Sequence, residues 1–292
     1  MSQAVLTSET FEVVAAEARR LADEACADAG IRMIEAHDAA TSGRLSSVLD
    51  QIWSRTGSPM MDSGLLVALA HAGNYEAIAE DRHGIPVGVT VGFCGPAGMP
   101  FHSHIVGVLP GRVGRGAGRA IKLVQRAWCL ERGIGTMTWT YDPLIARNAY
   151  FNLQRLGASA VEYLPDFYGT MTDTINAGQH SDRILTSWDL TATPPTPGAA
   201  GPDITDALPV VAEVDGAPTT YQPPTDASRP VSVAVPVDVE ALRRTDNDLA
   251  IRWRLETRRA LGELLRDDWV VTGFVRPETS GPAYVLERRG AE

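Results

Sequence analysis

Two histidines near the middle of the chain have the type and spacing needed for proton transfer. His102 and His104 are separated by one residue in a predicted strand, so both side chains are expected on the same face. Histidine titrates near neutral pH and can act as a general base. Two other roles stay open at this point: a structural pair held by hydrogen bonds, or two ligands of a metal site whose third ligand the sequence does not identify.

A glycine-rich turn follows this strand. The turn contains Gly114, Gly116 and Gly118, and from Arg119 onward apolar residues recur at helical spacing. The first N–H groups of a helix lack partners, and the helix dipole places partial positive charge beside them. A turn of this kind, in which glycine lets the backbone approach closely, can therefore bind phosphate. Arginines add positive charge to the same turn, at positions 112, 115 and 119.

Two common phosphate loops do not fit this turn. A P-loop ends in Gly-Lys-Ser/Thr, whereas this turn ends in Gly118-Arg119-Ala120. The dinucleotide fingerprint requires G-x-G-x-x-G, and the glycines here are spaced differently. Both possibilities are excluded.

The turn resembles the acyl-CoA loop of the GNAT (Gcn5-related) acyltransferases, which reads Q/R-x-x-G-x-G/A between the fourth strand and the third helix. Residues 113–118 read VGRGAG and match both glycines, with Val113 in the Q/R position. Residues 142–157, DPLIARNAYFNLQRLG, resemble the second signature of the family, a helix that ends in Leu-Gly. The resemblance covers about residues 30 to 190. More narrowly, the chain is similar to a bacterial branch of predicted acetyltransferases.

The resemblance implies an α/β (α+β) GNAT fold, in which helices flank a mixed central sheet. It also implies acetyl-CoA, or another short acyl-CoA such as succinyl-CoA, as co-substrate, with no metal. The acceptor would be the primary amine of a small metabolite. The residues expected to bind the cofactor are Val106, Gly107, Val108, Arg112, Val113, Gly114, Arg115, Gly116, Ala117, Gly118, Arg119 and Asn148.

The catalytic residues follow from the resemblance less directly. In the arylalkylamine N-acetyltransferases a His-x-His on the same strand supplies the base, which implies this role for His104, with His102 as the second candidate. The tyrosine that usually protonates the departing thiolate falls at Leu153 in this sequence, and leucine cannot donate a proton. Tyr150 and Tyr141 are the two substitutes, and water is a third possibility. Asn148 could contact the cofactor or cap its helix.

Composition narrows the class of protein. The chain has 292 residues, 44% of them hydrophobic and 21% charged, which are values typical of globular proteins. A net charge of −10 argues against nucleic acid as a main partner. No apolar run is long enough to predict a membrane span, and no signal peptide is visible. Three cysteines without metal spacing favour reduced thiols, so the sequence predicts a cytoplasmic protein.

The pattern along the chain predicts three parts. Residues 1–190 form the acyltransferase domain with an extra N-terminal helix, residues 191–230 a proline-rich linker or arm, and residues 231–292 a small α+β domain. The last of these is expected to pack on the first domain, and a homodimer is possible. Helices are predicted over 8–29, 39–53, 63–71, from 119 onward and 247–266. Strands are predicted over 31–35, 75–80, 87–94, 102–109 (with its apolar run at 105–109), 136–141, 160–163, 183–190, 208–214, 231–236, 269–275 and 283–287.

Two other functions stay open from the sequence alone. Leu153 and Val113 replace two residues of the family pattern, which favours an acyl-CoA-binding or regulatory module without catalysis. A metal-binding protein that uses His102 and His104 is the other alternative.

Overall fold

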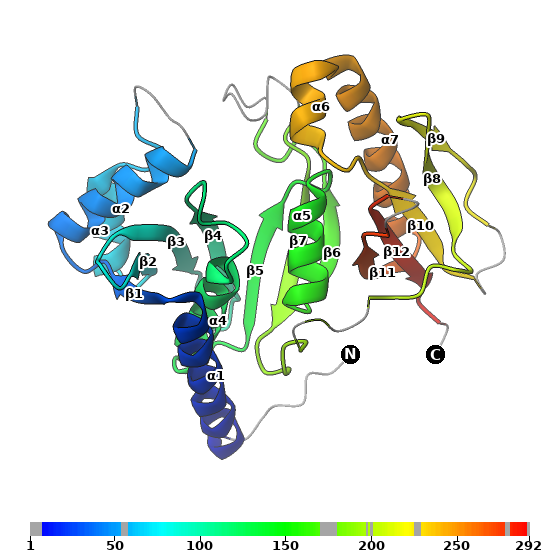
Figure 1. Ribbon diagram of the computed structural model, residues 1–292. Coiled ribbons are helices and arrows are strands. Elements are labelled where there is room, and N and C mark those ends of the chain that lie inside the picture. The colour runs from blue at the N-terminus through cyan, green and yellow to red at the C-terminus, as the bar shows by residue number, and fades with distance from the viewer. Residues whose placement is uncertain are drawn as a thin grey trace. The chain divides into compact units, whose positions relative to one another are not determined.

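The computed structural model describes residues 8–53, 58–169, 180–196, 198, 201–224, 229–277 and 281–290. The chain forms two compact units (Figure 1). The first runs to Trp139 and includes Asp189–Thr193, whereas the second comprises Thr140–Trp188 and continues from Pro194. The fold is mixed α/β, as predicted, and a second sheet lies in the C-terminal region.

The first unit is a mixed sheet with helices on both faces. Its elements are α1 (Ser8–Ala29), β1 (Ile31–Glu35), α2 (Ala39–Ile52), α3 (Ser63–His71), β2 (Tyr75–Asp81), β3 (Pro86–Cys94), β4 (Phe101–Val108), α4 (Ala117–Leu130) and the start of β5 (Thr136–Tyr141). The strands lie in the order β1-β2-β3-β4-β5. Pairs from β1 to β4 are antiparallel, and β4 pairs with β5 in parallel. The bounds agree closely with those predicted, although α4 begins earlier than Arg119.

The two faces of this sheet have separate cores. On one face, α2 and α3 cover apolar side chains of the strands; this cluster contains Leu45, Leu49, Leu66, Ile78, Val89, Val91 and Ile105. On the other face, Trp128 of α4 packs against Tyr75 of β2 and Phe101 of β4. Consecutive residues of a strand point to opposite faces, so each strand contributes to both cores.

A bulge interrupts this alternation in β4. Val91 of β3 pairs with Ile105 and Phe93 pairs with His102, so the single residue Gly92 lies opposite two residues of β4. Ile105 belongs to the core under α2, and His104 contacts Phe93 on that same face. The bulge therefore places His104 and Ile105, which are neighbours in sequence, on the same side of the sheet.

The second unit has its own core around two sheets. After β5 come α5 (Ala146–Tyr150), a π-helical turn (Phe151–Arg155), β6 (Ser159–Leu164) and β7 (Arg183–Asp189), which pairs antiparallel with β6. A five-stranded sheet has the order β11-β12-β10-β8-β9. Its strands are β8 (Leu208–Val214), β9 (Ala217–Thr220), β10 (Val231–Ala234), β11 (Trp269–Val275) and β12 (Ala283–Arg288), with α6 (Val239–Thr245) and α7 (Asn247–Arg266) beside them.

The two units are divided at a different place from the predicted boundaries at 190 and 230. Asp142 is buried and accepts hydrogen bonds from Arg243 at 2.7 Å and from Arg254 at 2.7 and 3.0 Å. Asp182 pairs with Arg258 in the same way. These ion pairs and a shared apolar core join residues 140–188 to the C-terminal part. The proline-rich segment also contributes β8 and β9 to the second sheet, and β9 and α6 have no counterpart in the predicted elements.

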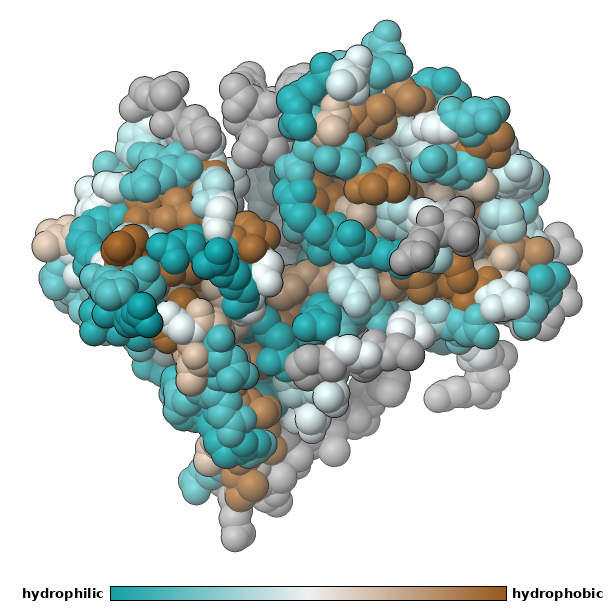
Figure 2. All heavy atoms as spheres, viewed as in Figure 1, coloured by the Kyte–Doolittle hydropathy of each residue, from teal (hydrophilic) through white to brown (hydrophobic). Residues whose placement is uncertain are grey.

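No helix in the described parts of the chain is long and apolar enough to cross a membrane. The face of the molecule shown in Figure 2 is largely hydrophilic, with separate apolar patches. Surface apolar residues of this kind are normal in a folded protein.

Replacing Asp142 by Asn should destabilise the second unit by about 3 to 5 kcal/mol, because it leaves two buried guanidinium groups without their counter-charge. The guanidinium groups also hold the pKa of Asp142 at about 2, so its stabilising contribution should persist down to strongly acidic pH. Chemical denaturation measures the loss. Asp248→Asn, at an exposed position in the first turn of α7, is the control and should change stability by less than about 1 kcal/mol. Equal effects of the two substitutions would contradict this prediction.

Candidate active site

The two histidines of β4 lie side by side next to an aromatic ring. Their ring centroids are 6.2 Å apart, and Phe93 lies 5.5 Å from His102 and 5.2 Å from His104. His102 is half-buried, and its Nδ1 is 3.2 Å from the hydroxyl of Thr138. His104 is exposed, and the described residues form no hydrogen bond with its ring. His102 is thus held in place, whereas neither ring nitrogen of His104 is bonded to a described residue.

The surroundings of both histidines lower their pKa values and so favour the neutral form of each ring. Burial lowers the pKa of His102, and His104 and Lys122 lower it further. His104 reaches solvent, yet the protein around it desolvates the ring enough to lower its pKa as well. Since the ordinary value is 6.5, both rings are mainly neutral at pH 7. A neutral imidazole can accept a proton, which a charged one cannot.

Two of the three glycines predicted to shape the turn after β4 have the expected left-handed conformation, whereas Gly118 lies in the first turn of α4. Gly111, Gly114 and Gly116 have φ of +81°, +86° and +85°, in the left-handed region that favours glycine. Gly116 is the N-cap of α4 and offers no side chain to the first N–H groups of that helix. These groups are therefore available to a ligand, which the phosphate-binding prediction requires.

The side chains of the turn differ in their exposure and in their partners. Arg112 makes an ion pair with Asp81 at 3.2 Å, which ties the turn to the end of β2. Val113 is 66% exposed, and Arg115 is exposed too. Ala117 is buried, whereas Gly118 and Arg119 are half-buried in the first turn of α4. Arg115 is thus the exposed arginine of the turn, whereas Arg112 already has a carboxylate partner.

The end of β4 has a packing role that the sequence did not reveal. A Cβ on Gly107 would lie 2.5 Å from the ring of Trp53, at the end of α2, so only glycine fits there. Val106 and Val108, on either side, are half-buried. Any contact of Gly107 with a cofactor would therefore be made by its backbone.

The remaining predicted site residues belong to the second unit. Tyr141 is 5% exposed, and its hydroxyl accepts a hydrogen bond from Tyr284 at 3.5 Å. Burial raises the pKa of Tyr141, so its hydroxyl remains protonated. Tyr150 is half-buried and packs against the core of that unit, with Arg276 over its ring. Asn148 is half-buried in α5, and Leu153 is a core residue.

One buried acidic residue on the histidine face was not predicted. Glu76 of β2 is 2% exposed, and neither carboxylate oxygen has a hydrogen-bond partner in the part of the chain that the structure describes. It pairs with Val91, whose side chain belongs to the core under α2, so it points to the same face as Phe93 and the histidines. Burial raises its pKa to about 7. The available sequence signal was an acidic residue that alternates with apolar ones at the start of a strand, but only the structure shows that its carboxylate has no partner among the described residues.

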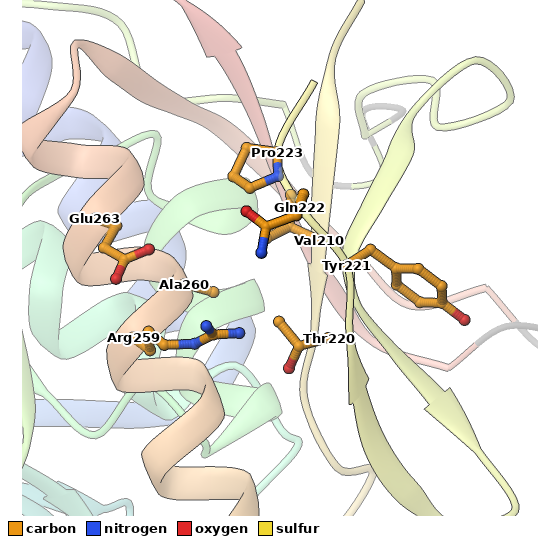
Figure 3. Close-up of a pocket in the computed structure, with 8 residues that line it drawn as sticks. All are labelled: Val210, Thr220, Tyr221, Gln222, Pro223, Arg259, Ala260 and Glu263. Atoms are coloured by element: carbon orange, nitrogen blue, oxygen red, sulfur yellow. The ribbon is translucent and has the colours of Figure 1, made fainter. Parts of the chain in front are cut away.

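The second unit has two hollows on its surface that differ in size. The first has a cavity volume of about 20 Å³, enough for a water molecule but not for a substrate. In Figure 3 its walls are formed by Arg259, Ala260 and Glu263 of α7 and by the chain opposite, whereas the ring of Tyr221 points away. The second is an open groove of about 430 Å³ between β6 and α7, with Leu255 and Arg258 among its lining residues. Neither hollow contains a predicted site residue.

Comparison with known proteins gives structural matches. No family model matches the chain, and no curated protein does. The chain is similar to a solved GNAT family acetyltransferase from Elizabethkingia anophelis with acetyl-CoA bound, at 12% identity, over 55% of this chain and 98% of that one, with a TM-score of 0.42. It is also similar to the ribosomal-protein-S18-alanine N-acetyltransferase from Escherichia coli. That match has 10% identity, covers 58% of this chain and 99% of that one, and has a TM-score of 0.43. A third similar structure is aminoglycoside 6'-acetyltransferase type Ii. That match has 18% identity, covers 56% of this chain and 99% of that one, and has a TM-score of 0.44.

The carboxyl of Glu76 should make the stability of the protein depend on pH. Its pKa is raised from 4.5 to about 7 in the folded protein, so the folded state holds a proton that the unfolded state releases between these values. Stability should therefore fall as pH rises from 5 to 7, by on the order of 1 to 3 kcal/mol, and should then level off. Glu76→Gln should remove this pH-dependent loss. Denaturation of both proteins at several pH values measures it, and identical pH profiles would refute the assignment.

Proposed function

We propose that the chain is an acyl-CoA-dependent N-acyltransferase. It moves an acetyl group, or another short acyl group such as succinyl, from the CoA thioester to the primary amine of a small metabolite. The observation that carries the proposal is that one strand, β4, has two neutral histidines on one face and leads directly into a turn of positive-φ glycines at a helix N-terminus. A proton acceptor and an anion-binding turn are thereby fixed to the same element.

The turn supplies the binding part of this function. The free N–H groups at the start of α4 would hold the pyrophosphate of CoA, with the helix dipole adding favourable charge. Arg115 is exposed beside them and can reach a phosphate. Val113 has no polar group, so phosphate binding at this point would depend on the backbone. This supports the proposal in spite of the missing Q/R residue, because backbone N–H groups do not depend on side-chain identity.

His104 fits the role of general base better than His102. Its nitrogens make no hydrogen bond with the described residues, whereas Nδ1 of His102 is engaged by Thr138. In the reaction, the amine nitrogen attacks the thioester carbonyl carbon and a C–N bond forms. His104 accepts the proton that the nitrogen loses, and the C–S bond then breaks to release CoA thiolate. His102 stands beside it as a second proton acceptor.

Protonation of the thiolate does not require a side chain. Thiols have a pKa of about 8.5, so a thiolate is a good leaving group and water can protonate it near neutral pH. Tyr150 and Tyr141 remain the two candidate acids among the side chains. Tyr141 has its hydroxyl bonded to Tyr284 in the core, which makes it the less suitable of the two.

A non-catalytic acyl-CoA-binding module is the second candidate. It is favoured by Leu153, which occupies the position of the usual tyrosine and is buried in the core of the second unit. A metal-binding function for His102 and His104 has less support, since no group of three or more possible ligands occurs in the described parts of the chain. Turnover of acyl-CoA separates these candidates from the transferase.

Release of CoA thiol from acetyl-CoA and succinyl-CoA, measured against a panel of primary amines, tests the proposal. His104→Ala should lower the rate constant by about 10²- to 10⁴-fold, the usual contribution of a general base, without changing acyl-CoA affinity in calorimetry. His37→Ala, at a histidine whose side chain is 72% exposed, is the control and should leave turnover unchanged. Tight binding of acyl-CoA without turnover would favour the module, and absence of binding would overturn the proposal.

The glycine turn allows a test of binding with a matched control. Gly114→Ala should weaken acetyl-CoA binding about tenfold or more, because alanine strains a φ of +86° and disturbs the turn that presents the N–H groups. Gly73 has a φ of +83° and similarly open surroundings at the end of α3. Gly73→Ala should therefore cost similar stability and leave acetyl-CoA affinity unchanged. Equal affinities of the two variants would contradict the assignment of the turn.

A further inference from the structure

The face of β4 opposite the histidines carries a buried chain of polar side chains. Nζ of Lys122, on α4, donates a hydrogen bond to Oγ of Ser103 at 2.8 Å. Ser103 donates to Oε1 of Gln125 at 2.9 Å, and Nε2 of Gln125 donates to Oγ1 of Thr90 on β3 at 2.6 Å. All four residues are buried. The chain thus links α4 to both strands that meet at the bulge.

Lys122 is unusual because it is buried and none of the described carboxylates pairs with it. Its side chain is 3% exposed, and its Nζ lies 3.8 Å from Sδ of Met137 and 3.8 Å from the ring centre of Trp139. Burial lowers its pKa to about 7, and Cys129 is the other titratable group that acts on it. A buried amino group of this kind costs stability relative to an apolar side chain. Its presence is therefore better explained by a task than by packing.

The position of Ser103 indicates that task. It lies between His102 and His104, within the bulge, and its side chain points to α4 while theirs point to Phe93. The register of a bulge is fixed only if the extra residue is held, because the sheet ladder is disrupted there. Lys122 and Gln125 hold this extra residue from the α4 face of the sheet, through hydrogen bonds with the hydroxyl of Ser103.

We infer that Lys122, Ser103, Gln125 and Thr90 are positioning residues, which lock the bulge of β4 and thereby set the geometry of the histidine pair. The catalytic part of this inference rests on the proposed function. Since α4 also begins at the glycine turn, the same helix would position both the anion-binding N–H groups and the base. The groups that face His102 are Phe93 from β3, Thr138 from β5 and His104 from its own strand.

The arrangement also predicts different responses of the two histidines. The positive charge of Lys122 contributes to the lowered pKa of His102, after burial and His104, whereas burial alone lowers the pKa of His104. Removal of the Lys122 charge should therefore move the titration of His102 more than that of His104. A residue that merely filled space would not produce this difference.

The experiment uses the full-length protein and NMR titration of the imidazole signals, assigned with His102→Ala and His104→Ala. Lys122→Met keeps the volume and removes the charge; it should raise the pKa of His102 toward 6.5 and move that of His104 less. Ser103→Ala removes the shared hydroxyl and should displace the signals of both histidines. Ser103→Thr keeps the hydroxyl and should restore them, while Ser42→Ala, at another buried serine of this unit, should leave them unchanged.

Turnover adds a second readout. Ser103→Ala should lower the rate constant at least tenfold while acetyl-CoA affinity stays within twofold, and Ser103→Thr should recover most of the rate. The inference is overturned if His102 titrates as in the wild type in Lys122→Met and the imidazole signals of Ser103→Ala match those of Ser42→Ala. If the wild type has no transferase activity, the proposed function fails, but the titrations still decide whether the chain positions the histidines.

Discussion

The candidate site depends on the register shift in β4. Without the bulge opposite Gly92, His104 and Ile105 would point to opposite faces, and the strand could not both offer the histidines beside Phe93 and place Ile105 in the core under α2. The glycine turn and α4 both continue from this strand. The turn of positive-φ glycines follows at its end, and α4 returns from that turn to cover the opposite face.

Some buried ionisable groups of the protein have a partner of opposite charge and others do not. Asp142 of the second unit is paired with Arg243 and Arg254, and Glu80 of the first unit is paired with Arg32 and Arg44. Glu76 and Lys122 of the first unit have no partner of opposite charge among the described residues, and burial shifts the pKa of each to about 7. Titratable groups poised near neutral pH cluster at functional sites more often than elsewhere, which agrees with a site on β4.

Much of the fold was predictable because its local signals are strong. The helices over 8–29 and 247–266 have regular apolar spacing, and the strands of the first unit show apolar runs bounded by turns. The boundaries of the units were not predictable, because they depend on ion pairs between distant segments, such as those of Asp142 with Arg243 and Arg254. The proline-rich composition of residues 191–230 predicted a linker or arm, and the strand predicted within it over 208–214 is confirmed as β8. The pattern did not predict β9, because a short strand is set by pairing, here with β8, which is a tertiary choice.

The sequence by itself determined which groups are available for chemistry. These are two histidines spaced to share a face, and glycines spaced to form a turn with positive φ before a helix. Both follow from local rules of backbone geometry that hold in any fold. The tertiary structure alone decided which groups are desolvated and what they touch. It buried Glu76 with no partner among the described residues, placed Lys122 on the face of β4 opposite the histidines and enclosed Tyr141 in a core with Tyr284. Burial and partners depend on contacts between segments distant in sequence, and these contacts set pKa values and orientation.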